Sequence, residues 1–319
     1  MQSVANAWDH VEARLASPDT FLTAGEATNL GISARDLKAR TATGALERVV
    51  RGVYARPLVD PTPESAYRRM VLAALVTRTR AGDRPVIAGP AAVVMYGLPL
   101  LGVPPTVVHV AEPQVRGRKP GRLLQPIGPV EVPVTTSAGV RLTGVADAVI
   151  DTARLMTVAA GVAAADAALR RNLLTRPELE AACRRRDRAA GVGPARRATR
   201  LATGLSESPG ESWSAVVIDE LGLPAPERQH SMHDDAGFVG RVDFWWPELS
   251  VVGEFDGRVK YGRRNPAGRP PEEVLWEEKL REDRLRRSGA TVIRWTTAEL
   301  VQPEALRRRL EPALRRHRP

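Results

Sequence analysis

The sequence predicts an α/β fold, α+β overall, and three observations support this. The first sixty residues have the pattern of short helices followed by a β-prone run. The central region mixes short apolar strands with Ala/Arg-rich helices, and the last third combines helices with a β-hairpin and a late strand. A chain of 319 residues can form two or three domains with separate cores. We expect domains at 1–60, 61–204 and 205–319.

The composition favours a polyanionic partner. The formal net charge is +10, and double-stranded DNA is the first candidate. The alternative is a compositional bias that keeps the protein in solution. The single cysteine, Cys183, excludes an intramolecular disulfide and a thiolate metal cluster. The start of the chain lacks a signal-peptide pattern, and no apolar run approaches the roughly 20 residues that span a bilayer. We therefore expect a cytoplasmic protein without a membrane partner; the sequence does not indicate its oligomeric state.

Residues 1–60 are predicted to form a winged helix-turn-helix. Two short helices joined by a tight turn at Gly31 are typical of this motif. Ser33 is the expected N-cap of the second helix, with Asp36 three residues later. The β-prone run 46–57 would form the wing. The expected DNA-binding residues lie on the second helix and the wing: Ser33, Arg35, Lys38, Arg40, Arg48 and Arg51. The alternative is a generic helical domain with solvated arginines.

The middle region, 61–204, is predicted to be a mixed α/β domain. Prolines between 57 and 63 mark its start, because residues before proline disfavour helix. An amphipathic helix is expected at 64–82, followed by short strands, and residues 143–203 are mostly helical. These patterns do not indicate a role for the domain.

A stretch from Gly240 to Tyr261 carries the candidate chemistry. Two β-type runs flank a Pro-Glu turn, and alternation places Val242, Phe244 and Trp246 on one face and Asp243 on the other. The second run has Leu249, Val251, Gly253 and Phe255 on one face, and Val252, Glu254 and Asp256 on the opposite one. Pairing as an antiparallel hairpin would bring the three carboxylates, Asp243, Glu254 and Asp256, to one side.

Clustered carboxylates repel one another unless a cation neutralises them, and Mg²⁺ prefers oxygen ligands. We therefore expect Asp243, Glu254 and Asp256 to bind Mg²⁺ or Mn²⁺. Lys260 would place an ammonium beside metal-bound water, as required for phosphodiester cleavage. The alternative is an open hairpin face with solvated acids. Val252 argues against it, because an apolar residue among the acids suggests that both faces are covered.

The C-terminal region resembles the PD-(D/E)xK nuclease superfamily, and within it the very-short-patch-repair-type endonuclease domain. The resemblance rests on Asp243, on Glu254-x-Asp256-Gly, and on the later run LREDRLRRSGATVIRW, so it covers the last third of the chain. It implies a restriction-endonuclease-like mixed sheet flanked by helices. Lys260 stands where these domains usually carry a histidine. The resemblance also implies an early helical glutamate facing the metal, here Glu211, although Ser208 and Glu211 equally fit a helix capping box.

The N-terminal region resembles the winged helix of AbiEi-type antitoxins of type IV toxin–antitoxin systems, mainly through the block Arg48 to Tyr54. That resemblance implies operator binding, transcription regulation and a cognate toxin as a further partner. Two hypotheses follow. The first is a Mg²⁺-dependent DNA endonuclease or nickase, with Asp243, Glu254, Asp256, Lys260 and Glu211 as catalytic residues. The second is an antitoxin-like regulator with an inactive nuclease fold.

Overall fold

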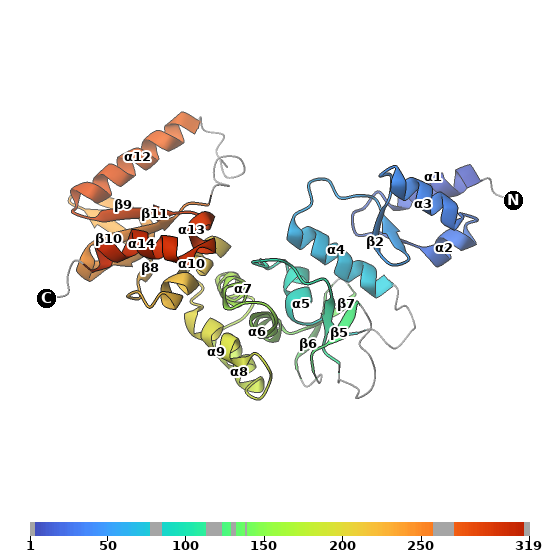
Figure 1. Cartoon of the computed structure of the whole chain (residues 1–319), viewed down its shortest axis with the longest axis horizontal. Coiled ribbons are helices and arrows are strands. Elements are labelled where there is room, and N and C mark those ends of the chain that lie inside the picture. Colours follow the sequence, from blue (N-terminus) through green and yellow to red (C-terminus); the bar gives the residue numbers. More distant parts are fainter. Residues whose placement is uncertain are drawn as a thin grey trace.

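The computed structural model describes residues 4–76, 85–112, 123–128, 132–137, 139–257 and 271–315. The elements form three groups in chain order, and the middle helices lie between the N-terminal group and the C-terminal sheet (Figure 1). Helices and mixed sheets occur together, which confirms the α/β prediction. Across these described ranges, no helix is both long and apolar enough to cross a membrane.

The N-terminal group has the element order predicted for a winged helix-turn-helix. Its elements are α1 (Val4–Arg14), β1 (Leu22–Thr23), α2 (Ala24–Asn29), α3 (Ala34–Ala42), β2 (Glu47–Val50) and β3 (Val53–Ala55). The three strands form an antiparallel sheet in the order β1-β3-β2. Gly31 has a φ of +76° in the turn between α2 and α3, a conformation that favours glycine. The predicted capping box of Ser33 and Asp36 is confirmed.

Helix α4 (Pro63–Val76) contributes to two cores. On one side, Ala73 packs with Phe21 and Val53 of the N-terminal group. On the other, Tyr67 and Val71 belong to the core of the middle region. The helix therefore joins the winged helix to the middle domain through buried apolar contacts.

The middle region combines small strand pairs with a helical cluster. Its elements are α5 (Gly89–Met95), β4 (Val108–Val110), β5 (Leu124–Pro126), β6 (Val134–Ser137), β7 (Val140–Thr143), α6 (Val145–Leu155), α7 (Val158–Arg170), α8 (Arg176–Arg185) and α9 (Val192–Leu201). Strands β4 and β5 are parallel, and β6 and β7 are antiparallel. The helices pack closely: a Cβ on Gly161 would lie 2.3 Å from the Cβ of Ala153. A larger residue at 161 would push α7 away from α6.

The C-terminal group is a mixed four-stranded sheet between helices, as predicted. Its elements are α10 (Pro209–Glu220), β8 (Glu227–Asp234), β9 (Gly237–Trp246), the 3-10 turn η1 (Pro247–Leu249), β10 (Val251–Phe255), α12 (Pro271–Arg287), β11 (Thr291–Trp295), α13 (Thr297–Val301) and α14 (Pro303–Leu314). The order is β11-β10-β9-β8, with only β10 and β11 parallel. Phe244 and Trp295 pack against α10, α13 and α14, whereas Val252 packs against Leu285 of α12.

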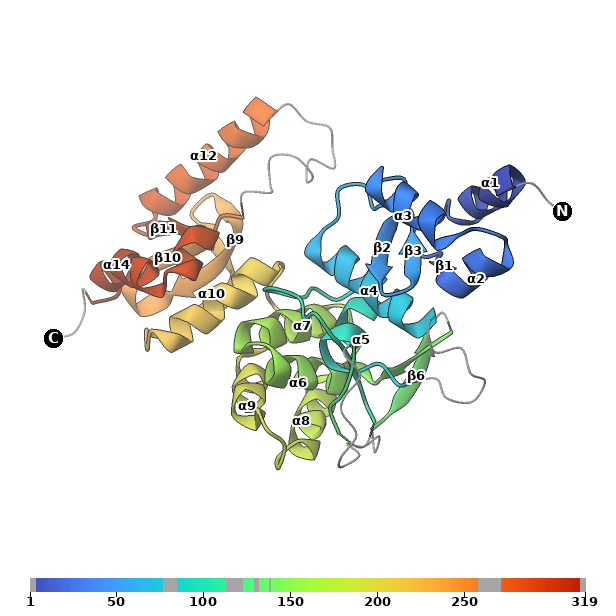
Figure 2. The same cartoon turned by 45° about the vertical axis from the view of Figure 1, so that its right-hand side comes forward.

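Helix α10 lies between the middle helices and the C-terminal sheet (Figure 2). Its Val216 belongs to the middle core, whereas Val217 and Ile218 belong to the core under the sheet. The expected domain boundary at 204/205 lies in the connection between α9 and α10. The two regions nevertheless share a buried interface along α10.

Candidate active site and DNA-binding surface

The predicted acidic hairpin forms, and it brings Asp243 next to Glu254. Strands β9 and β10 are antiparallel, with Phe244 opposite Gly253, so Asp243 and Glu254 follow at the next position. The predicted faces of β10 are confirmed. Phe255 packs with the α10 side of the sheet, and Val252 with the α12 side.

The predicted faces of β9 are partly wrong. Phe244 and Trp246 do pack together on the α10 side, but Val242 packs with Val252 on the α12 side. The regular alternation therefore changes at Asp243. The physical reason lies across the strand pair, where Gln229 has a φ of +54°, in the left-handed region. Such a conformation is uncommon for a residue other than glycine and interrupts the pleat.

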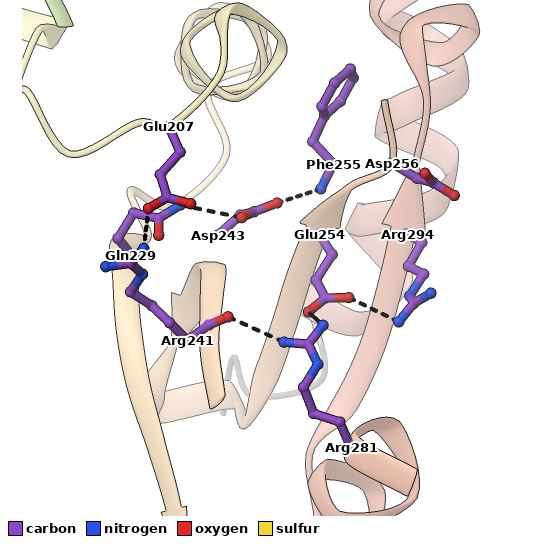
Figure 3. Close-up of a pocket in the computed structure, with 9 residues that line it drawn as sticks. All are labelled: Glu207, Gln229, Arg241, Asp243, Glu254, Phe255, Asp256, Arg281 and Arg294. Atoms are coloured by element: carbon purple, nitrogen blue, oxygen red, sulfur yellow. Dashed lines mark hydrogen bonds and ion pairs between the residues drawn. The ribbon is translucent and has the colours of Figure 1, made fainter. Parts of the chain in front are cut away.

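A cavity of about 280 Å³ lies where this irregularity meets the end of β10. Its lining combines four acids, three arginines and two other side chains: Glu207, Asp243, Glu254, Asp256, Arg241, Arg281, Arg294, Gln229 and Phe255 (Figure 3). We call this cavity the carboxylate–arginine pocket. The arrangement confirms that Asp243, Glu254 and Asp256 border one site.

Asp243 accepts hydrogen bonds at both carboxylate oxygens. The backbone N–H of Phe255 donates to Oδ2 at 2.9 Å, and the Gln229 amide donates to Oδ1 at 3.2 Å. The same Gln229 nitrogen donates to Oε2 of Glu211 at 2.8 Å. One amide group therefore holds the Asp243 and Glu211 carboxylates close together. No local pattern in the sequence marks Gln229 as a site residue, because its position depends on its unusual backbone conformation.

Glu211 is buried, and it contacts both the N-terminus of α10 and the site. Ser208 is the N-cap as expected, but the predicted capping box is incomplete, because the Glu211 carboxylate accepts from the Ser208 hydroxyl and the Glu207 N–H and not from the Ser208 N–H. The Ser208 hydroxyl donates to its Oε1 at 2.7 Å, and its own N–H donates to the Ser208 hydroxyl at 3.2 Å. Its Oε2 accepts from the backbone N–H of Glu207 at 2.7 Å as well as from Gln229. The contacts of Glu211 with the start of α10 and with Gln229 of the site are therefore compatible.

Glu254 lies between two arginines. The side chain is only 10% exposed, Oε1 pairs with Arg281 Nη2 at 2.6 Å, and Oε2 pairs with Arg294 Nη2 at 3.0 Å (Figure 3). Arg294 also pairs with Glu282 at 3.1 Å. Arg281 reaches from α12 into the pocket. The parallel register of β10 and β11 places Arg294 directly opposite Glu254.

Asp256 lies just beyond the end of β10 and borders the pocket. Its backbone N–H donates to the Trp295 carbonyl at 2.7 Å, and its side chain is half-buried. Lys260, the expected cation beside the site, lies outside the described residues. Its predicted role is therefore not tested.

The pocket does not offer a preformed Mg²⁺ or Mn²⁺ site. Carboxylate oxygens are suitable ligands, but both oxygens of Asp243 and both of Glu254 already accept hydrogen bonds or ion pairs. Within the described ranges, no three His, Cys, Asp or Glu side chains are arranged to hold a metal ion. Each carboxylate oxygen can accept more than one bond, but a cation beside Glu254 would compete with the Arg281 and Arg294 guanidinium groups.

Most of the predicted DNA-binding residues lie on the surface of the N-terminal group. Arg35, Lys38, Arg48 and Arg51 are exposed, the first two on α3 and the others on the β2–β3 hairpin. Ser33 is also exposed, and its hydroxyl is engaged with Asp36 at 2.6 Å in the cap.

Arg40 differs from these residues because it contacts helix α1. Its guanidinium lies 4.1 Å from the centre of the Trp8 ring and pairs with Glu12. A cation over an indole ring is stabilising. We infer that Arg40 mainly fixes α3 on α1, and so positions the helix that carries Arg35 and Lys38.

No family model matches the chain. Two proteins of Mycobacterium tuberculosis are similar to it: uncharacterized protein Rv2248 of strain H37Rv and uncharacterized protein MT2308 of strain CDC 1551. Each is 29% identical over 287 residues, which cover 89% of this chain and 96% of the relative. The similarity thus extends over nearly the whole chain.

Proposed function

We propose that this protein binds double-stranded DNA through its N-terminal winged helix. The observation that supports this best is the exposed basic surface on the helix-turn-helix. Arg35 and Lys38 project from α3, and Arg48 and Arg51 from the adjacent hairpin. A recognition helix of this kind enters the major groove, while basic residues on the wing contact phosphates. The net charge of +10 adds a long-range attraction to a polyanion.

The salt dependence of DNA binding tests this proposal. The double variant Arg48→Ala, Arg51→Ala, which removes two basic residues of the wing, should bind duplex DNA more weakly, and its log–log salt slope should fall by about 2, since each lost phosphate contact contributes about 0.9. Fluorescence anisotropy with labelled duplexes, including DNA upstream of the protein's own gene, measures both quantities. Arg196→Ala is the control: this exposed arginine on α9 pairs with Asp187. An unchanged slope in the double variant would contradict the proposal.

A second candidate activity is Mg²⁺- or Mn²⁺-dependent DNA cleavage at the carboxylate–arginine pocket. It is favoured by the shared hydrogen bonds of Gln229 to Glu211 and Asp243, and by the position of Asp243 and Asp256 in the lining of one pocket. It is opposed by the ion pairs that occupy Glu254. The rival is a transcription regulator, with a cognate toxin as a further partner, in which the pocket has no catalytic role.

A cleavage assay separates these two possibilities. Supercoiled, linear and mismatched DNA would be incubated with Mg²⁺ or Mn²⁺ and with wild type, Asp243→Asn or Glu207→Gln. Glu207 also borders the pocket, but it pairs with Arg241 at an exposed position. Nicking that depends on metal and is lost only in Asp243→Asn supports the enzyme. DNA binding with no cleavage of any substrate, by any variant, supports the regulator.

A further inference from the structure

We infer that Arg281 and Arg294 form a binding site for a DNA phosphodiester, and that the Glu254 carboxylate occupies this site in the absence of DNA. The inference deepens the proposed function and rests on it for the source of the phosphate. It assigns to the pocket the recognition of a single phosphate group.

The two guanidinium groups come from different elements and converge on one anion. Arg281 extends from α12 and Arg294 from β11, and each contacts a different oxygen of Glu254, at 2.6 Å and 3.0 Å. Two such donors facing two oxygens match the geometry of a phosphate as well as that of a carboxylate. Glu254 therefore stands in for an anionic ligand.

The arginines remain accessible while the carboxylate is covered. The side chains of Arg281 and Arg294 are 27% and 31% exposed, whereas that of Glu254 is 10% exposed. All three line the pocket. A phosphate can therefore approach the guanidinium groups from the pocket without opening the sheet.

Arg281 has contacts that do not depend on Glu254. Its Nη1 donates to the backbone carbonyl of Arg241 at 3.2 Å. Its aliphatic part passes over Gly240, where a Cβ would lie only 2.9 Å from Arg281 Cδ. The absence of a side chain at 240 gives the arginine room on the sheet. Arg281 can therefore stay in place when its anionic partner changes.

Glu254 is an internal competitor, so the wild-type protein should bind isolated phosphate weakly. DNA bound to the winged helix would present phosphodiesters at a high local concentration, which favours the exchange. Removing the charge of Glu254 should also make the two guanidinium groups more available to phosphate, in this case without DNA. The substitution Glu254→Gln removes the carboxylate that the two arginines share and keeps the size of the side chain, while Arg294 still pairs with Glu282.

The test compares inorganic phosphate binding to wild type, Glu254→Gln and Glu207→Gln by isothermal titration calorimetry. Both variants remove one negative charge from the pocket, but Glu207 pairs with Arg241 instead. Glu254→Gln should bind phosphate at least about tenfold more tightly than wild type, and Glu207→Gln within about threefold. Tenfold corresponds to about 1.4 kcal/mol. Adding Arg281→Gln to Glu254→Gln should abolish the gain.

Equal phosphate affinity of Glu254→Gln and Glu207→Gln would overturn the inference. Circular dichroism checks folding; if Glu254→Gln does not fold, Glu254→Asp, which shortens the carboxylate by one methylene, must show a gain in the same direction. Thymidine dinucleotide in place of phosphate distinguishes a diester site from one that takes only inorganic phosphate, and preference for inorganic phosphate would also overturn it. Duplex binding by the variant Arg48→Ala, Arg51→Ala tests the proposed function of the winged helix alone. The binding of inorganic phosphate tests the pocket separately.

Discussion

The buried carboxylate of Asp166 connects the middle helices to the C-terminal sheet. It lies on α7 with 1% exposure and accepts from the backbone N–H groups of Thr203 and Gly204, at 2.7 Å and 2.8 Å. The Ser212 hydroxyl at the start of α10 donates at 2.7 Å, and Arg228 of β8 lies 3.5 Å away. Removing this one side chain would leave a buried arginine without its counter-charge and a buried hydroxyl without its acceptor.

Asp166→Ala should therefore lower the free energy of unfolding of the C-terminal region by about 3–5 kcal/mol, the usual cost of breaking a buried ion pair by removing one partner. Asp166→Asn keeps an acceptor for the two backbone N–H groups and should cost less. Urea unfolding followed by tryptophan fluorescence is a suitable assay, because of the six tryptophans only Trp8 lies outside residues 205–319.

Asp187→Ala provides a matched control. Its ion pair with Arg196 is exposed on both sides, at 52% and 59%, so its loss should cost no more than about 1 kcal/mol. If Asp166→Ala were no more destabilising than Asp187→Ala, the assignment of Asp166 as the buried connection would be refuted.

Two further predictions concern α10 and α3. Gly210→Ala should lower the free energy of unfolding in urea by about 1–3 kcal/mol, because a Cβ there would lie 2.0 Å from the Phe255 ring. Gly193→Ala is the control: it lies at the same position of α9 with open space around it and should be neutral or stabilising. Equal effects of the two substitutions would contradict the predicted clash with Phe255. The Ser33 hydroxyl and N–H lower the pKa of Asp36, so the protection of α3 amides from hydrogen exchange should be complete above the ordinary aspartate pKa and fall as pH drops through the lowered pKa. Asp36→Asn should lack this acid-dependent loss, and a wild-type profile that matches the variant's would count against the cap.

Local signals in the sequence predicted the elements that depend on neighbouring residues. Gly31 and Ser33 fixed the turn and the start of α3, because a left-handed glycine and an N-cap act within one turn of helix. The hairpin of β9 and β10 followed from alternation on either side of Pro247 and Glu248. Each of these features is a property of a few consecutive residues.

The partners of the acidic residues could not be predicted in the same way. Glu254 is paired with Arg281, 27 positions later, and with Arg294 on a parallel strand, so both contacts require the register of the sheet. The face change at Asp243 depends on the backbone of Gln229 in another strand. Sequence alternation describes one strand at a time and therefore missed both effects.

Two shared helices explain why the proposed DNA-binding surface and the pocket should respond to the same perturbations. Helix α4 packs in the N-terminal and middle cores, and α10 packs in the middle and C-terminal cores. Arg69 on α4 is 3% exposed and pairs with Glu47 of the wing at 3.1 Å, just as Asp166 ties α7 to the start of α10. Because the middle core supports both helices, loosening it should disturb both ends of the protein. A substitution in the middle core that weakens duplex binding without touching Arg35 or Lys38 would be the expected sign of this coupling.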